Sequence, residues 1–158
     1  MMDGQFSLQI QKFIEKAGAR ADDVVGEVVT NLAATVDYRS PVGDASYWKS
    51  PPPKGYVGGR FRANWNLSIG APDLSTTERT DRSPKSPDRG GARTGEITAT
   101  IPEQAAGNVY YLANSLPYAQ RLEDGWSRQA PNGIVSRTVV EFQSIVDDAV
   151  ASAKARMP

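Results

Sequence analysis

The stretch that decides the fold is SPVGDASYWKSPPPKGYVGGRFRANWNLSIG, residues Ser40 to Gly70. Its second part alternates apolar and polar side chains, and this period of two predicts a β-strand with one buried face. The buried face would carry Phe61, Ala63, Trp65, Leu67 and Ile69. The first part, residues 40–59, is rich in proline and aromatic residues and lacks this alternation, so we expect a stiff loop ahead of the strand.

Helical patterns flank this stretch on both sides. Apolar residues recur every three or four positions from Leu8 to about Val36, which predicts one long helix, and again from about Ile134 to Ala155. Gly18 and Gly26 each weaken the first helix by about 1 kcal/mol relative to alanine, so it needs packing against the rest of the chain or another subunit. The first stripe consists of Ile10, Phe13, Ile14, Ala17, Ala21, Val24, Val25, Val28, Leu32 and Val36, and the second of Val135, Val139, Phe142, Val146, Ala149 and Ala153.

The segment between the first strand and the last helix is mixed. Residues 95–101, GEITATI, alternate again, and we expect them to pair with the first strand as an antiparallel neighbour. Residues 109–112 predict a further strand, and residues 118–122 a short helix or turn. Residues 73–95 have almost no apolar content and cannot bury enough surface to offset the entropy of ordering, so we expect a long, mobile hairpin arm there.

These elements predict an α+β domain. The long N-terminal helix and the C-terminal helix would pack on one face of a small antiparallel β-sheet, and the polar hairpin arm would extend from it. A chain of 158 residues and 17.1 kDa is the size of one domain, so we assign residues 1–158 to a single unit with an interface loop, 40–59, and an extended arm, 73–95.

Composition excludes several classes of function. The 18 basic and 18 acidic side chains balance, which leaves no global field to attract nucleic acid or a membrane. The absence of cysteine and histidine removes thiolate ligands, the cysteine nucleophile and the usual general base. No run approaches the roughly 18 apolar residues of a membrane span. We therefore expect no enzyme activity, no cofactor, no metal site and no membrane partner.

Acidic pairs are the remaining candidates for metal binding or acid–base chemistry. Asp22–Asp23 and Asp147–Asp148 lie in predicted helices, where adjacent side chains point about 100° apart and do not converge on one ion. We interpret both pairs as solvated helix faces. Glu123–Asp124–Gly125 could bind calcium in a turn, but a role in a hairpin or a cap is the more ordinary expectation.

Two segments resemble a known family. RSPVG at residues 39–43, followed by GGRFRANWNLSIG at 58–70, resembles the SPVDTG…RLRANW…G signature of the tail-completion or neck proteins of long-tailed bacteriophages. NSLPYAQRLEDGWSRQAPNGIV at 114–135 resembles that family's N…PYA…LE.GTS.QAP.G.V segment, which also precedes a closing helix. The order and approximate spacing agree over most of the chain. This sequence departs from the pattern by an insertion within residues 43–59 and by EDGWS in place of E.GTS.

The resemblance implies a non-enzymatic structural protein of the virion. It would form a homomeric ring at the neck, six-fold like the tail tube, and join the DNA-filled head to the tail. Its partners would be further copies of the chain, a head-completion or connector protein, and a tail-tube or tail-terminator protein. Genomic DNA would pass through the lumen without sequence-specific binding, and assembly would take place in the host cytoplasm.

We expect subunit or partner contacts from aromatic and arginine side chains, because a proline-stiffened loop loses little entropy on docking and aromatic side chains anchor interfaces. The expected interface residues are Tyr47, Trp48, Tyr56, Arg60, Arg62, Arg79, Arg82, Trp126 and Arg128.

Two alternatives remain open. Within the same class, the chain could be a tail terminator that caps the tail tube. From a different class, it could be a nucleic-acid-binding module that pairs a basic set with phosphates. That set would be Arg60, Arg62, Lys85, Arg89 and Arg93.

Overall fold

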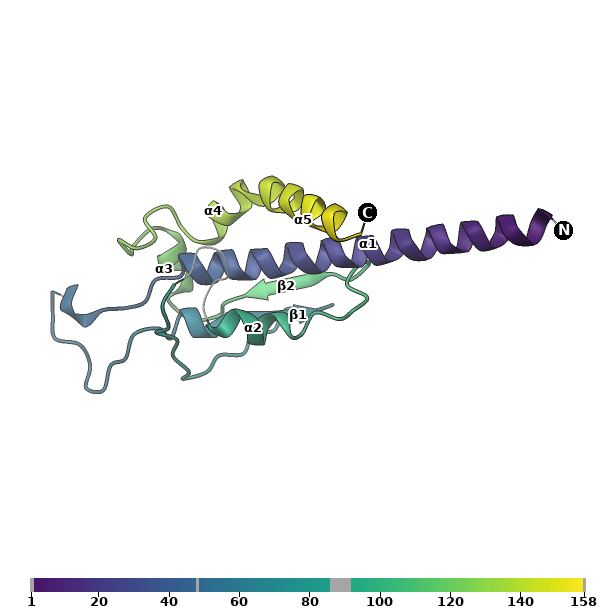
Figure 1. Cartoon of the computed structure of the whole chain (residues 1–158). Coiled ribbons are helices and arrows are strands. Elements are labelled where there is room, and N and C mark those ends of the chain that lie inside the picture. Colours follow the sequence, from purple (N-terminus) through teal and green to yellow (C-terminus); the bar gives the residue numbers. More distant parts are fainter. Residues whose placement is uncertain (1, 48, 86–91, 158) are drawn as a thin grey trace.

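The computed structural model describes residues 2–47, 49–85 and 92–157, without the side chains of 2–8, 10, 13, 14, 47, 92 and 93. Figure 1 shows the arrangement of its elements. In chain order these are α1 (Met2–Arg39), η1 (Ala45–Tyr47), η2 (Arg62–Asn64), β1 (Asn66–Ile69), α2 (Ala92–Thr98), β2 (Tyr110–Ala113), α3 (Ala119–Glu123), α4 (Val135–Val140) and α5 (Phe142–Arg156).

The long helix α1 runs through the middle of the molecule. The β-sheet and α2 lie on one side of it, and α4 and α5 lie on the other (Figure 1). Both terminal helices therefore lie on the same side of the sheet, with α1 in contact with it and α5 forming a second layer behind α1. The predicted α+β class and the two terminal helices are confirmed.

The sheet has two antiparallel strands. β1 pairs with β2 in a register that places Asn66 opposite Ala113 and Ile69 opposite Tyr110. The strand predicted at 109–112 is confirmed, but the predicted pairing of β1 with residues 95–101 is wrong. Ile97 lies on α2 and is buried, and Ile101 packs against the same core. These two residues are four apart, so the alternation that suggests a strand also fits one face of a helix.

The predicted first strand is shorter than its alternating pattern. Its first residues form η2, and only residues 66–69 are a strand. Between Phe61 and Trp65 every side chain is buried, including those of Arg62 and Asn64. The polar residues face inward because each finds partners within the chain, as described below.

The predicted C-terminal helix is interrupted. α4 ends at Val140, and α5 begins at Phe142 after Glu141. Ala149 and Ala153 are buried, and α5 packs along α1. The first half of the predicted apolar stripe is instead exposed, which sequence periodicity did not predict.

The predicted hairpin arm is only partly what the sequence suggested. Residues 73–85 have no regular secondary structure, as expected, but they lie against the segment 59–66 and form hydrogen bonds with it. Because residues 95–101 are not a strand paired with β1, the segment is not the tip of a hairpin. Residues 86–91 lie outside the described residues.

The first half of α1 projects beyond the body of the protein (Figure 1). α5 ends beside Arg20, whose guanidinium donates to the carbonyl of Met157. We call residues 2–19 the α1 projection. The side chains that the structure describes within it, at positions 9, 11, 12 and 15–19, are exposed. Across the described residues, no helix has the length and apolar character needed to cross a membrane.

Candidate interaction surface

The residues that carry the family resemblance form an interlocked scaffold at the end of α1. Glycines allow the backbones of its loops to meet. A Cβ atom on Gly58 would lie 1.8 Å from the carbonyl oxygen of Gly43, and one on Gly59 would lie 2.3 Å from that of Asp81. Gly59 also has φ of +97°, a conformation that favours glycine. The two adjacent glycines therefore serve close backbone packing.

A buried ion pair crosses this scaffold. The guanidinium of Arg62 donates from Nη2 and Nε to Oδ2 of Asp37, at 2.8 and 3.1 Å, and from Nη1 to the carbonyl of Ser83 at 2.6 Å. Both charged side chains are 0% exposed. Asp81 lies 3.7 Å from Nη1. Arg62, expected at an interface, is therefore an internal tie between α1, η2 and the segment 73–85, and it presents no surface to a partner.

Ser40 joins the end of α1 to the aromatic core. Its hydroxyl donates to the carbonyl of Val36 at 2.6 Å and accepts from Nε1 of Trp65 at 2.7 Å. Lys85 donates to the carbonyl of Ser40. Burial lowers the pKa of Lys85, and the nearby Arg62 cation lowers it further. Trp65 packs edge-on against Phe61, which confirms both as core residues.

The side chain of Asn64 forms hydrogen bonds with the first part of the polar segment 73–85. Its amide nitrogen donates to the carbonyls of Arg60 and Thr77, and its oxygen accepts from the backbone N–H of Thr77 at 2.7 Å. Arg60 forms an ion pair with Glu78 at 2.7 Å on the surface. The polar side chains of GRFRANW, those of Arg60, Arg62 and Asn64, therefore form contacts within the chain.

Glu123 closes the second half of the scaffold by capping α4. Its carboxylate accepts hydrogen bonds from the backbone N–H groups of Ile134, Val135 and Ser136 at 2.7–3.0 Å, and from the Ser136 hydroxyl. Gly133 leaves room for it, because a Cβ there would lie 2.6 Å from Oε1. Of the two roles expected for this acidic turn, a hairpin or a cap, the structure shows the cap.

The Glu123 cap makes stability depend on pH. Burial opposes ionisation, but the hydrogen bonds from residues 134–136 outweigh it and hold the pKa of Glu123 below its ordinary value of 4.5. Its contribution is therefore present above that value and is lost as pH falls through the folded pKa. Glu123→Gln should lower the free energy of unfolding by about 1 kcal/mol at pH 7, and its difference from the parent should shrink as the pH falls below 4.5 and through the folded pKa.

Urea titrations at a series of pH values would measure this effect, with the exposed Glu103→Gln as the matched control. A constant difference between the Glu123→Gln variant and the parent from pH 7 to pH 3 would contradict the cap.

The two resembling segments contact each other directly. Gln129 and Val42 exchange hydrogen bonds between side-chain amide and backbone, at 2.8 and 3.1 Å. The amide of Asn114 donates to the carbonyl of Phe61 at 2.8 Å. Residues 87 and 53 positions apart in sequence are therefore joined in a single unit.

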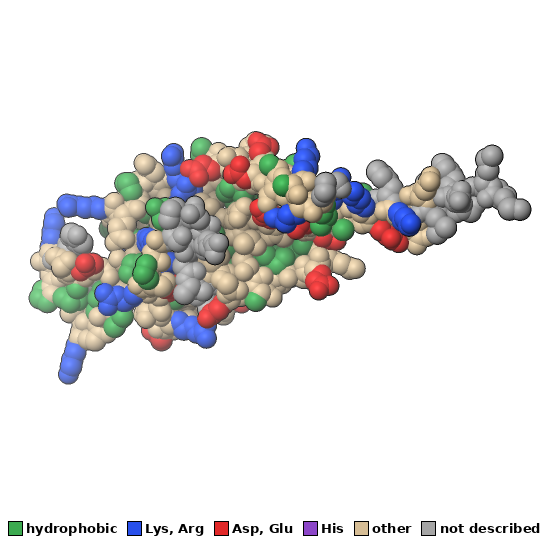
Figure 2. Space-filling view, viewed as in Figure 1, with side chains coloured by type: hydrophobic (Ala, Val, Ile, Leu, Met, Phe, Trp, Pro, Cys, Tyr) green, Lys and Arg blue, Asp and Glu red, His purple; other side chains and the backbone are tan. Residues whose placement is uncertain are grey.

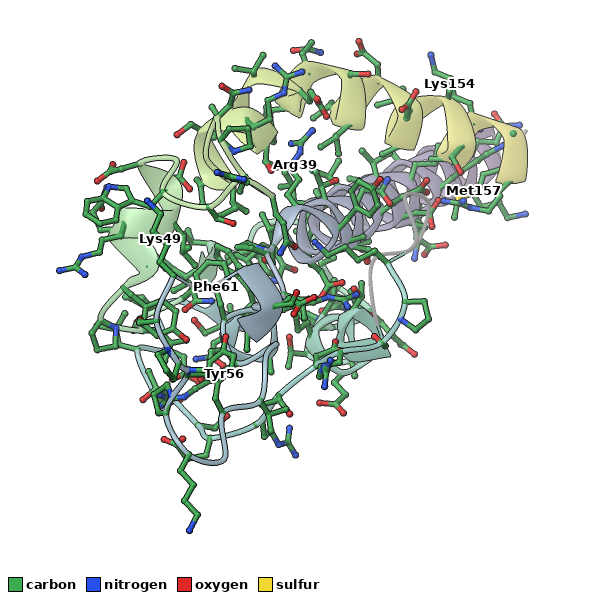
Figure 3. All side chains as sticks on the ribbon, turned by 90° about the vertical axis from the view of Figure 1, so that its left-hand side faces the viewer. Arg39, Lys49, Tyr56, Phe61, Lys154 and Met157 are labelled. Carbon is green, nitrogen blue, oxygen red and sulfur yellow. The ribbon has the colours of Figure 1, made fainter. Side chains whose placement is uncertain are left out.

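An open pocket of about 890 Å³ lies beside this unit. It lies on the side of α1 opposite α5, where Figure 3 labels Tyr56 and Phe61. Burial raises the pKa of Tyr118, so this phenol stays protonated at neutral pH. The pocket walls include Pro41, Tyr56, Phe61, Tyr118 and Leu122, with the polar Arg60, Arg121 and Gln129. The pocket therefore combines apolar walls with a few polar groups.

The predicted interface residues are scattered around this end of the molecule. Trp126 is 73% exposed and stacks with Arg121, whose guanidinium carbon lies 5.3 Å from the ring centroid. Tyr56 and the arginines Arg82 and Arg128 are exposed, and Arg79 pairs with Glu96 at 3.3 Å. Tyr47 ends η1, although its side chain is not described, and Trp48 lies outside the described residues.

The three members of the nucleic-acid alternative's basic set whose side chains are described each bind other parts of the chain. Arg62 is buried, Arg60 is paired with Glu78, and Lys85 binds within the scaffold. The residue Arg89 and the side chain of Arg93 lie outside the described parts. Acidic and basic side chains intersperse over the face in Figure 2. None of these contacts favours binding to phosphates.

Three of the four acidic residues in these helical pairs have partners within the chain, and the partners of Asp22 and Asp23 are distant in sequence. Asp22 accepts from the backbone N–H of Ala106 at 2.8 Å, and Asp23 pairs with Arg156. Asp147 accepts from the amide of Gln143 one turn earlier. Within residues 2–47, 49–85 and 92–157, no group of three or more potential ligands is placed to hold a metal ion.

Comparisons with protein-family models, with curated proteins and with solved structures found no match. The resemblance to phage neck proteins therefore rests on the residues quoted above.

Proposed function

We propose that this chain is a structural component of a bacteriophage neck and forms a homomeric ring that joins head and tail. One observation carries the proposal: the two segments that resemble the family interlock in space. The Gln129–Val42 and Asn114–Phe61 contacts join them, and Trp65 and Ser40 continue the connection to α1. Unrelated short matches would have no reason to converge on one scaffold.

The distribution of departures from the family pattern also supports the proposal. Residues that match the pattern, such as Arg62, Asn64 and Glu123, are bound inside the scaffold. The inserted loop extends from one end of the molecule (Figure 1), and the departure at Trp126 is highly exposed. Conserving the scaffold while changing the surface would leave the fold intact and alter which partner it fits.

Mass spectrometry of purified phage particles would test this function. The chain should be present in mature virions, at a copy number that corresponds to one ring per particle. Its absence from mature particles would overturn the structural role and favour an assembly factor.

Deletion of the gene would separate joining from tail termination. Full heads beside finished but unattached tails are the expected result, because joining is the missing step. Tubes of uncontrolled length would instead identify a tail terminator.

A further inference from the structure

The loop that follows β1 is fixed by side chains of the strand. The hydroxyl of Ser68 donates to a carbonyl within the loop at 2.6 Å and accepts from the backbone N–H of Asp73 at 3.0 Å. The side-chain amide of Asn66 donates to the carbonyl of Ser75 at 2.7 Å. We call residues 70–75 the anchor loop, because these hydrogen bonds hold its backbone in one conformation.

This rigid loop exposes an apolar side chain next to a carboxylate. Leu74 is 64% exposed, and the preceding Asp73 is exposed as well. Hydrogen bonds from Ser75 lower the pKa of Asp73, so its carboxylate is charged at neutral pH. A lone exposed leucine is ordinary on a protein surface, but one on a preorganised loop can bind a partner with little loss of conformational entropy.

Two more exposed apolar residues lie beside the anchor loop. Ile69 directly precedes the loop and is 41% exposed. The carbonyl of Val109 accepts a hydrogen bond from the backbone N–H of Gly70 at 2.9 Å, and Val109 is 61% exposed. The anchor loop therefore lies at an apolar end of the sheet, where a partner would shield apolar surface from water.

The open pocket beside Tyr56 and Phe61 offers a complementary surface (Figure 3). Its volume of about 890 Å³ and its apolar walls can enclose a leucine side chain. Tyrosine, tryptophan and arginine dominate binding at many protein interfaces. Tyr56, Tyr118 and Arg121 line this pocket, and Trp126 stacks with Arg121. The pocket thus has the composition of a binding site for a protein side chain.

Arg121 gives the pocket a positive charge that is not neutralised. Its guanidinium stacks with Trp126, and within the described parts of the chain no carboxylate forms an ion pair with it. The charge of the other arginine of the pocket, Arg60, is balanced by Glu78 at 2.7 Å. An apolar side chain with a neighbouring carboxylate would therefore complement the pocket in both polarity and charge.

We propose that the anchor loop of one subunit docks in the pocket of a second copy of the chain, with Leu74 inside the pocket and Asp73 paired with Arg121. Leu74 does not line the pocket of its own subunit, where the hydrogen bonds to β1 hold it in solvent. Because the contact joins two different surfaces, it is a head-to-tail interface, which closes into a ring when the rotation between subunits allows. The inference deepens the proposed function and rests on it for the identity of the partner as a second copy.

Cysteine cross-linking of the full chain would test this contact, because the protein has no cysteine of its own. Ser75 adjoins Leu74, and Ser127 lines the pocket, so Ser75→Cys and Ser127→Cys leave Leu74 and Arg121 in place. The two proteins would be mixed under reducing conditions and then oxidised. Mass spectrometry should find a 75–127 disulfide at least about tenfold above the product of Ser75→Cys with Ser144→Cys, because a disulfide demands close and specific geometry. Ser144 is the matched control, since it is exposed on α5 and does not line the pocket.

Other cross-linking results would overturn the proposal. A dominant 75–75 disulfide would show pairing of two loops, and a dominant 127–127 disulfide would show pairing of two pockets. Equal yields of the 75–127 and 75–144 products would show contact without specificity. A chain that stays monomeric, or that self-associates without a 75–127 product, would also overturn the interface.

The charge contact has a measurement of its own. Asp73→Asn keeps an oxygen that can accept from the backbone N–H of Ser75 but removes the charge, and Arg121→Gln removes the opposite charge. In sedimentation, each variant should weaken self-association about threefold or more, and the double variant should be no weaker than either, because the same contact is lost once. Arg128→Gln is the matched control and should associate like the parent, since Arg128 is exposed and does not line the pocket. Additive losses in the double variant would contradict the pairing.

The apolar part of the contact can be tested at Leu74 itself. Leu74→Asp should abolish the faster-sedimenting, self-associated species of the parent, whereas Leu74→Met, with an apolar side chain of similar volume, should retain it. Circular dichroism should show both variants folded, because the position is exposed. Retained association in Leu74→Asp would contradict the interface.

The outcome stays separate from that of the neck function. Self-association without the 75–127 product would reject this interface alone. Absence of the protein from phage particles would reject the neck function, whatever the cross-links show.

Discussion

Arg62→Met should lower the free energy of unfolding by about 3–5 kcal/mol, because it leaves a buried carboxylate without its partner. Asp37 is fully buried and accepts two hydrogen bonds from this guanidinium. The variant would also remove a donor from the carbonyl of Ser83. Urea denaturation followed by circular dichroism would measure the loss.

Arg60→Met is the matched control for this effect. Arg60 lies two residues away and also forms an ion pair, but its partner Glu78 is largely exposed. Exposed pairs contribute about 1 kcal/mol or less, so this variant should remain close to the parent. The double variant Arg62→Met with Asp37→Leu should recover part of the loss, since it leaves no unpaired buried charge. Equal effects of Arg60→Met and Arg62→Met would refute the role of the buried pair.

Trp65→Ala should cost about 3–5 kcal/mol through lost burial and the cavity left behind. The side chain is 3% exposed and packs in the core with Phe61, Val36 and Ile134. Its removal also leaves the hydroxyl of Ser40 without the indole donor. Thermal melting and solubility of the expressed variant would report the loss.

Two further variants divide the contributions of this tryptophan. Trp65→Phe keeps most of the apolar volume and removes the hydrogen bond to Ser40, so it should cost less than Trp65→Ala. Trp126→Ala removes an exposed ring and should change stability by no more than about 0.5 kcal/mol. A Trp65→Ala protein that melts with the parent would show that the ring is not part of the core.

The sequence predicts the fold well where one pattern dominates. The long first helix, the strand near residues 109–112 and the short helix near 118–122 correspond to α1, β2 and α3. For each of these elements, the spacing of apolar residues or a chain-breaking proline fits one type of secondary structure better than the other.

The errors arise where one pattern fits two structures. Ile97 and Ile101 suit a strand by alternation and a helix by their spacing of four, and packing of α2 against α1 decides between them. Val135 and Val139 continue the stripe of α5, but the break at Glu141 turns them to the surface. Tertiary packing overrides the local pattern in both places.

The candidate site was predictable only in part. The Glu123 turn was expected to form a hairpin or a cap, and the hydrogen bonds from three consecutive backbone N–H groups show that it is a cap. The burial of Arg62 was not predicted, because Asp37 and Ser83 are distant in sequence and no local pattern identifies them. A charged residue at a polar position of an alternating pattern, such as Arg62, is predicted to be exposed unless its partners are known.

The unbroken length of α1 has a mechanical consequence. Its 38 residues form a rod about 57 Å long, at roughly 1.5 Å per residue. One end is the projection, and the other is fixed to the scaffold through Asp37 and Ser40. Because a helix resists bending, a force that displaces the projection is transmitted along α1 to the start of the loop at residues 40–59. We therefore expect α1 to act as a lever that couples the position of the projection to that of the loop at residues 40–59.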